Sequence, residues 1–239
     1  MAKPVPSHSF SLVLYADVGR GAAQGAAVAH AEGNPPTILA TISGEDAKGE
    51  TTADALGERT VASIKHIASE LVATLPHGSR VAHACCLLAS PFYTTETTTI
   101  RYHGDKILVT EELIQKLINT QHAANQNSAA MEPISSKIID ISVNGYPTGN
   151  PYGKQGTDVA VHLFQSAVDK NIAKRLRAAV LPTGVNLSFE PLSFAAFAVL
   201  RELCGAPQHF LLVSVGNKVT ELACVRNGVL ERTVSFPLG

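Results

Sequence analysis

The feature that most constrains the fold is a strand–turn–strand pattern that occurs twice, once near each end of the chain. The first copy spans residues 12–28 and the second spans residues 210–225. When the two copies are superposed, residues 214–216 fall on residues 17–19. Each copy has an apolar run, a tight polar turn with a glycine, and a second apolar run. The pattern therefore predicts one β-hairpin in each half of the chain.

The two predicted turns have a composition that suits the binding of an anion. Glycine has no Cβ, so Gly19 and Gly216 would let the backbone come close to a ligand and would tolerate positive φ. Successive exposed amides at such a turn form a concavity that binds anions, above all phosphate. Two turns from opposite halves of one molecule therefore predict a site that holds a triphosphate from both sides.

These turns resemble the phosphate loops of the actin-like ATPase superfamily, and within it the chain most resembles the bacterial cell-division family FtsA. Residues 17–19 read Asp-Val-Gly, as in the first phosphate loop, and residues 214–221 resemble the second loop, usually written Asp-Ile-Gly-Gly-x-Thr-Asp. Residues 144–146 (Asn-Gly-Tyr) and 150–153 (Asn-Pro-Tyr-Gly) lie between two strands, in the order found in the FtsA insert subdomain. Residues 190–192 (Glu-Pro-Leu) also resemble FtsA and its pilus relative PilM.

The resemblance implies an α/β fold with an actin-like, ribonuclease-H-like first lobe, an inserted α+β subdomain and the opening β-hairpin of the second lobe. Three strands, a helix with apolar residues at helical spacing, and a further strand follow one another between residues 10 and 88, which agrees with the start of such a lobe. The expected domains are residues 1–79 and 166–209 for the first lobe, 80–165 for the insert, and 210–239 for the start of the second lobe.

The resemblance also implies ATP and Mg²⁺ as cofactors, with Asp17 holding Mg²⁺ through water. The nucleotide-binding residues that it implies are Asp17, Gly19, Arg20, Gly21, Gln24, Ser214, Gly216, Asn217, Lys218, Thr220 and Glu221. The alternative for Asp17 is a carboxylate that caps a turn, and the alternative for Glu221 is a solvent-facing residue of the hairpin. No residue is assigned as catalytic.

Two departures from the family pattern argue against fast ATP hydrolysis. Ser214 stands where the second loop usually has Asp, and the loss of a preorganised charge can lower a rate by roughly ten-fold to a thousand-fold. The family also continues beyond the second hairpin with the rest of that lobe and its adenosine-binding residues. We therefore expect weak or no nucleotide binding by this polypeptide, and at most a slow ATPase.

An FtsA-like chain would be a cytoplasmic scaffold at the inner face of the membrane that self-associates or forms filaments. It would bind the tubulin-like division protein FtsZ, and later division proteins through its insert, and it would reach the membrane only through elements outside this sequence. The alternative is a PilM-like component of type IV pilus assembly. A sugar or acetate kinase and an Hsp70-type chaperone fit the sequence less well, because no substrate acid or base stands out and because Hsp70 lacks an insert here.

Composition excludes several other classes. The net charge of −1 provides no basic field for nucleic acid or anionic lipid, and the apolar runs are too short to span a bilayer. The four cysteines lie in apolar segments without metal-ligand spacing, which predicts reduced thiols in a cytoplasmic protein. Residues 149–155 superficially resemble a Walker loop, but the spacing is one residue short and Gln155 replaces the Mg²⁺-binding Ser or Thr, so we interpret this stretch as a rigid surface turn.

Overall fold

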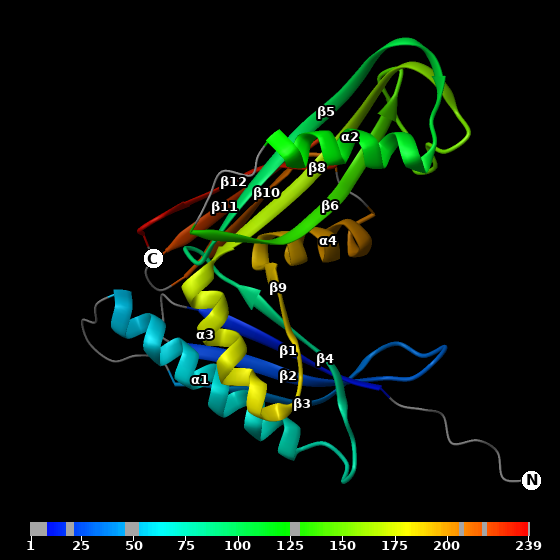
Figure 1. The fold of residues 1–239 in the computed structure, drawn as a ribbon. Helices are drawn as coiled ribbons and strands as arrows, with labels where there is room; N and C mark the ends of the chain where they lie inside the picture. The colour runs from blue at the N-terminus through cyan, green and yellow to red at the C-terminus, as the bar shows by residue number, and fades with distance from the viewer. Residues whose placement is uncertain are drawn as a thin grey trace, which may run out of the picture.

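The computed structural model describes residues 9–17, 22–45, 53–124, 130–205, 208–216 and 219–238, with the backbone alone for residues 17, 53, 54 and 122–124. Within these residues the chain forms a five-stranded, a four-stranded and a three-stranded β-sheet, with four α-helices packed on them (Figure 1).

The five-stranded sheet contains the first predicted hairpin and has the strand order β3-β2-β1-β4-β9. Its strands are β1 (Ser9–Asp17), β2 (Ala22–His30), β3 (Thr37–Ser43), β4 (Val81–Leu88) and β9 (Leu187–Pro191). The first three strands form an antiparallel meander, and β4 pairs with β1 in parallel after the chain has passed through helix α1 (Ala53–Ala73). Three strands, a helix and a parallel strand follow one another in the predicted order.

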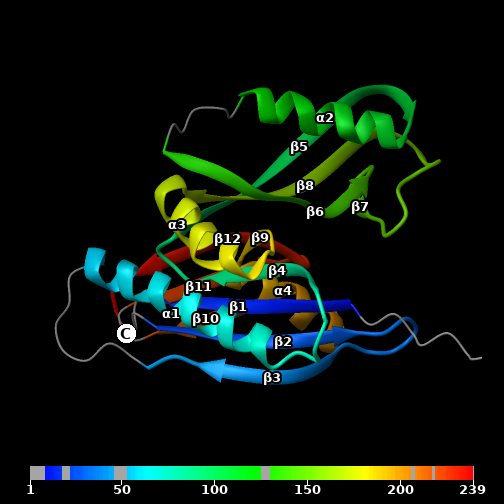
Figure 2. The same ribbon diagram turned by 60° about the horizontal axis from the view of Figure 1, so that its bottom comes forward.

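Helices α1 and α3 (Lys170–Val180) lie side by side on one face of this sheet (Figures 1 and 2). Ile64, Ile67 and Leu71 of α1 are fully buried against Leu12 and Leu14 of β1. A Cβ atom at Gly25 of β2 would lie 2.7 Å from Ile67 Cγ2 and 2.7 Å from Leu71 Cδ1. The absence of a side chain at Gly25 therefore lets α1 approach the sheet closely.

The four-stranded sheet has the order β5-β8-β6-β7, so the long strand β8 pairs with a neighbour on each side. Its strands are β5 (Tyr93–Leu108), β6 (Met131–Val143), β7 (Tyr146–Pro147) and β8 (Gln155–Asp169). Helix α2 (Glu111–Ala124) covers one face, with Ile114 and Ile118 packed on Val161 and Leu163. Thr110 Oγ1 accepts a hydrogen bond from the Leu113 amide at 3.2 Å and so caps the N-terminus of this helix.

The second predicted hairpin belongs to a three-stranded antiparallel sheet of β10 (Phe210–Val215), β11 (Thr220–Arg226) and β12 (Val229–Phe236). Asn227 and Gly228 both have positive φ, as a type I′ turn between β11 and β12 requires. One face packs on helix α4 (Leu192–Leu203) and on Phe164 of β8. On the other face, three apolar residues of β10 are exposed: Leu211, Val213 and Val215.

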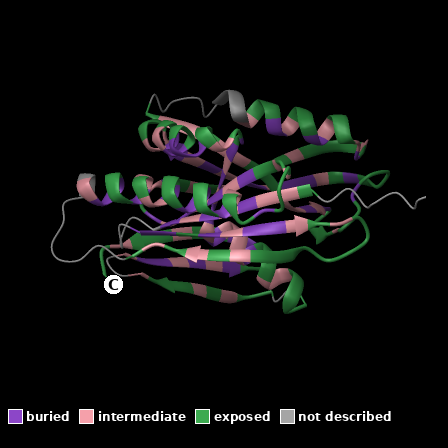
Figure 3. Ribbon diagram, turned by 90° about the horizontal axis from the view of Figure 1, so that it is seen from below, coloured by how far each residue is buried: buried purple, intermediate pink, exposed green. Residues whose placement is uncertain are grey.

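The burial pattern follows this layering. Figure 3 shows buried residues along the strands and on the inner sides of the helices, and exposed residues along the outer sides of α1 and α2. The described part of the chain has one hydrophobic cluster between α1, α3 and the five-stranded sheet, one under α2, and one where α4 meets the three-stranded sheet.

Two predicted domain boundaries disagree with the strand pairing. The insert was predicted to start at residue 80, but β4 pairs with both β1 and β9 and so belongs to the five-stranded sheet. The insert was predicted to end at residue 165, but β8 continues to Asp169 because residues 166–169 still pair with β5 or β6. Helix α3 begins only after Asp169, whose carboxylate accepts hydrogen bonds from the amides of Asn171 (2.9 Å) and Ile172 (3.1 Å).

A half-buried ion pair joins α3 to the four-stranded sheet. Arg177 Nη1 lies 3.0 Å from Glu132 Oε2, and Arg177 Nη2 lies 2.5 Å from Glu132 Oε1. The Arg177 hydrogen bonds hold the pKa of Glu132 below its ordinary value of about 4.3. The pair therefore stabilises the fold fully above that unfolded-state pKa, and its contribution is lost as the pH falls through the lower folded-state pKa.

We expect Glu132→Gln to lower the free energy of unfolding by about 0.2–1 kcal/mol at pH 7, because the pair is partly exposed. The difference between the variant and the parent should be smaller at pH 3 than at pH 7, because acid protonates more of the parent's Glu132. Urea denaturation at pH 7 and at pH 3 measures the difference in free energy of unfolding between the variant and the parent at each pH. Glu58→Gln is the control, since Glu58 lies 3.9 Å from Arg175 and is largely exposed; an equal effect of the two variants would contradict the prediction.

Candidate functional site

The strand ends that lead into the two predicted phosphate loops lie at the same end of the molecule (left in Figures 1 and 2). The Ala89 amide, just after β4, donates to the Ala16 carbonyl of β1 at 3.2 Å. Four residues later, the Tyr93 hydroxyl donates to the carboxylate of Glu221 in β11. A short series of contacts therefore joins the end of the first hairpin to the second hairpin, although they are far apart in the sequence.

The structure describes part of the predicted first loop. Asp17 is the last residue of β1 and pairs with Ala22 of β2, but its side chain lies outside the described atoms. Residues 18–21, which include the predicted Gly19, Arg20 and Gly21, lie outside the described residues. Gln24 is exposed on β2, opposite Tyr15 and two residues from the start of the strand.

The predicted second loop is closed by its own glycine. The Gly216 amide donates to the Val219 carbonyl at 3.0 Å, and a Cβ atom at Gly216 would lie 2.7 Å from that same oxygen. Any larger residue would push this turn open. The Gly216 amide is therefore used within the turn, and the predicted Asn217 and Lys218 lie outside the described residues.

The remaining predicted residues of the second loop divide by burial. Ser214 is exposed and pairs across the hairpin with Glu221. Thr220 is buried, and its hydroxyl donates to the Leu238 carbonyl at 2.6 Å. The side chains of Thr220 and Glu221 therefore have partners within the protein, and Ser214 is the member of this group with an accessible hydroxyl.

Glu221 belongs to a buried cluster that also contains Tyr93 and Ser193. All three residues are at least nine-tenths buried, with exposed fractions of 9%, 7% and 4%. The single phenol proton is donated to Glu221, so the Ser193 hydroxyl donates to the Tyr93 oxygen across 2.9 Å. Burial and the neighbouring negative charge of Glu221 raise the pKa of Tyr93, so the phenol keeps its proton and remains a donor.

Sequence reasoning missed Tyr93 and Ser193. Tyr93 is the first residue of β5, and Ser193 lies in the first turn of α4, directly after the Glu-Pro-Leu segment; no motif assigns either residue to the site. Tyr93 and Glu221 are 128 positions apart, so no local pattern could have paired them. The solvent-facing alternative for Glu221 does not hold, because the side chain is buried against the four-stranded sheet.

A cavity of about 210 Å³ adjoins this cluster, between the start of β5 and the strands β11 and β12. Hydroxyl groups dominate its lining, and Glu221 is the one acidic residue among them. The residues that line it are Ser90, Tyr93, Thr94, Thr95, Glu221, Thr233, Val234 and Ser235. The cavity lies beside the second loop and could admit small polar ligands or water.

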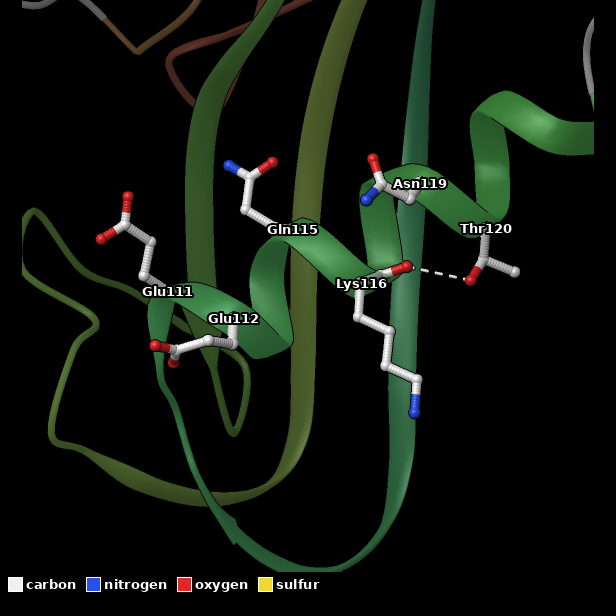
Figure 4. A pocket seen from close by; sticks show the side chains of 6 residues that line it. All are labelled: Glu111, Glu112, Gln115, Lys116, Asn119 and Thr120. Carbon is white, nitrogen blue, oxygen red and sulfur yellow. Dashed lines mark hydrogen bonds between the residues drawn. The ribbon is translucent and has the colours of Figure 1, made fainter.

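A larger hollow of about 690 Å³ lies along α2, far from the two hairpins. It is lined by six polar residues of that single helix, and Figure 4 shows their side chains on its outer surface.

In the part of the chain that the structure describes, no group of three or more His, Cys, Asp or Glu side chains could hold a metal ion. The helices in those same residues are all too short or too polar to cross a membrane.

The stretch that resembles a Walker loop forms a surface turn, as predicted. The Gly153 amide donates to the Val109 carbonyl at 3.0 Å, and the Lys154 amide donates to the Pro151 carbonyl at 3.2 Å. The Lys154 ammonium donates to Thr148 Oγ1. These groups are therefore engaged within the turn, and no phosphate cradle is formed here.

Comparison with known proteins identifies the fold. No protein-family model and no curated protein sequence matches the chain. A solved structure of the PilM–PilN type IV pilus biogenesis complex matches with a TM-score of 0.55 and 15% identity, over 99% of this chain and 63% of that one. A Bacteroides thetaiotaomicron protein of unknown function with an actin-like ATPase fold matches with a TM-score of 0.46 and 12% identity, over 96% of this chain and 70% of that one.

The chain thus spans less than two thirds of the PilM–PilN chain that it matches, while almost all of its own residues align. At this level of identity the similarity concerns the fold. The protein has an α/β actin-like ATPase fold, as its paired hairpins predict.

Proposed function

We propose that this protein is an actin-like scaffold that binds ATP with Mg²⁺ between the ends of its first and second hairpins and that self-associates. The observation that supports this proposal is the placement of the two hairpin ends at one end of the molecule, joined through the Ala16–Ala89 and Tyr93–Glu221 contacts. In this proposal Asp17 holds hydrated Mg²⁺, while the turn amides at 18–21 and 217–218 approach the phosphates.

The described residues fit a triphosphate in part. Gln24 and Ser214 offer exposed polar side chains beside the two turns, which suits phosphate oxygens. Glu221, a charge that would repel phosphate, is turned away into its contact with Tyr93. The Gly216 amide is already engaged by Val219, so the proposal does not use it as a donor. The triphosphate of ATP would supply the negative charge that the amides of these turns attract. A scaffold of this kind needs at most slow hydrolysis of ATP.

Two cellular roles fit such a scaffold. The Asn-Gly-Tyr and Asn-Pro-Tyr-Gly segments favour an FtsA-like role in division, with FtsZ and later division proteins as partners at the inner face of the cytoplasmic membrane. The similarity to the PilM–PilN structure favours a role in type IV pilus assembly, and it covers 99% of the chain, the four-stranded sheet included. The presence of the four-stranded sheet in this chain therefore does not discriminate between the division role and the pilus role.

Isothermal titration calorimetry with ATP, with and without Mg²⁺, tests the nucleotide proposal. We expect weak, Mg²⁺-dependent binding in the parent that becomes roughly 10- to 100-fold weaker still in Asp17→Asn, because a charge-assisted contact contributes about 1.5–3 kcal/mol. Glu45→Gln, which removes an exposed carboxylate after β3, is the control for net charge. Identical Mg²⁺ dependence in the parent and Asp17→Asn would exclude Asp17 from the site.

Direct binding measurements separate the two roles. Purified FtsZ and an N-terminal peptide of the pilus protein PilN are titrated into the full chain under the same conditions. Saturable binding of FtsZ alone supports the division role, and saturable binding of the PilN peptide alone supports the pilus role. If neither binds, both assignments fail, while the nucleotide proposal is still judged by calorimetry.

A further inference from the structure

The buried Tyr93–Glu221 hydrogen bond lies where three parts of the fold meet. Tyr93 begins β5 of the four-stranded sheet, directly after the segment that bonds to β1 of the five-stranded sheet. Glu221 lies in β11 of the three-stranded sheet, opposite Ser214 and two residues after the turn. Ser193 Oγ of α4 completes the cluster at 2.9 Å from the phenol oxygen.

The chemistry of this contact makes it directional. A buried carboxylate is unfavourable without a donor, and the phenol proton has one orientation that satisfies it while Ser193 donates to the phenol oxygen. Apolar packing elsewhere in this junction, around Phe164 and Phe197, has no such angular preference. The hydrogen-bonded cluster therefore fixes the position of β11 relative to β5 more narrowly than packing does.

The other polar contacts between these strands lie farther from the two turns. Thr95 Oγ1 contacts Thr233 Oγ1, and Thr97 Oγ1 donates to the Leu230 carbonyl at 2.5 Å. They hold β12 along β5, whereas the Tyr93–Glu221 bond acts at the turn end of the hairpin. Thr97 therefore offers a matched control: it joins the same two sheets through a hydroxyl but has no contact near the turns.

We propose that Tyr93 and Glu221 are positioning residues, whose hydrogen bond sets the separation of the second hairpin from the first and so the width of the nucleotide site. Glu221 acts on the ligand through this contact and does not touch it. The proposal rests on the function proposed above, because it names the contact that keeps the two phosphate turns at a fixed separation. Its main test, however, measures that separation in the absence of nucleotide.

The separation can be measured by electron paramagnetic resonance between two spin labels, Ser43→Cys on β3 and Val213→Cys on β10. Both positions are exposed and lie outside the cluster. The accessible native cysteines, Cys85, Cys204 and Cys224, are first replaced by alanine or serine. We expect one narrow distance distribution in this parent, a broadened or shifted distribution in Tyr93→Phe, and an unchanged one in Thr97→Val.

The conservative variant separates the hydrogen bond from general stability. Glu221→Gln keeps an amide oxygen that can accept from Tyr93, so its distance distribution should match that of the parent. If Tyr93→Phe is unfolded by circular dichroism, the double variant Tyr93→Phe/Glu221→Leu replaces it, because that pair leaves no unpaired buried charge. A parent-like distribution in Tyr93→Phe, or a broadened one in Glu221→Gln, would overturn the proposal.

Nucleotide binding gives the second readout. If the proposed function holds, Tyr93→Phe should weaken Mg²⁺–ATP binding by roughly tenfold or more, since a loosened site loses preorganisation, and Glu221→Gln should bind like the parent. If no variant and no parent binds ATP, the proposed function fails. The spin-label distances still decide whether the hydrogen bond positions the hairpin.

Discussion

Phe164→Ala is expected to lower the free energy of unfolding by about 3–5 kcal/mol, as for other large-to-small changes in a packed core. The Phe164 ring is 1% exposed and stacks on Phe194 with ring centroids 4.5 Å apart. It also belongs to the cluster that contains Phe197 and Leu230. Removing it leaves a cavity where the four-stranded sheet, α4 and the three-stranded sheet meet.

Urea denaturation followed by circular dichroism measures this loss, and hydrogen exchange locates it. Exchange should increase in β10–β12 more than in β1–β3, because the cavity lies under the three-stranded sheet. Tyr146→Ala is the control, since this aromatic side chain is 77% exposed and its removal should change stability by no more than about 0.5 kcal/mol. A loss of less than about 1 kcal/mol for Phe164→Ala would contradict the described packing.

Ile67→Ala is expected to cost about 2–5 kcal/mol, because Ile67 of α1 is fully buried against the five-stranded sheet. Gly25→Ala should cost about 1–3 kcal/mol by overpacking, since the new Cβ would lie 2.7 Å from Ile67 Cγ2. When both changes are made, the added methyl group enters space that Ile67 has left. The double variant should therefore be more stable than the sum of the two effects predicts, by roughly 0.5–3 kcal/mol.

A double-mutant cycle in urea measures this coupling. Gly57→Ala in α1 is the matched glycine control, because the nearest atom to its added Cβ is Ile172 Cδ1 at 4.0 Å. Alanine is favoured over glycine inside a helix, so this change should stabilise the protein by about 0.5–1 kcal/mol. Strict additivity at Gly25 and Ile67 would show that α1 does not approach β2 as closely as the structure has it.

Local features account for much of what the sequence predicts correctly. The apolar spacing that predicts α1 and the strand–turn–strand patterns that predict the two hairpins each depend on residues that are close in the sequence. Helical periodicity, capping and turn chemistry act over a few residues, so a single sequence reveals them. The resemblance of the two hairpin turns to the phosphate loops of the actin-like superfamily implied the overall fold.

The candidate site was predicted less completely. The sequence placed Asp17, Gln24, Ser214 and Glu221 around one ligand, and the structure brings the two hairpin ends to one end of the molecule. The role of Glu221 was open in the sequence, and its burial against Tyr93 decides it. The role of Gly216 also differs, since its amide closes the turn and is not free for an anion.

The sequence by itself determined the hairpins, the long helices and the α/β class, because these follow from the local alternation of apolar and polar residues. Only the tertiary structure decided that β4 pairs with both β1 and β9, that β8 continues to Asp169, and that Tyr93 meets Glu221. Each of these outcomes depends on strands or side chains that are distant in the chain, and their pairing is set by the burial of whole faces at once. The pattern of neighbouring residues does not indicate which distant strand or side chain will cover a given apolar face.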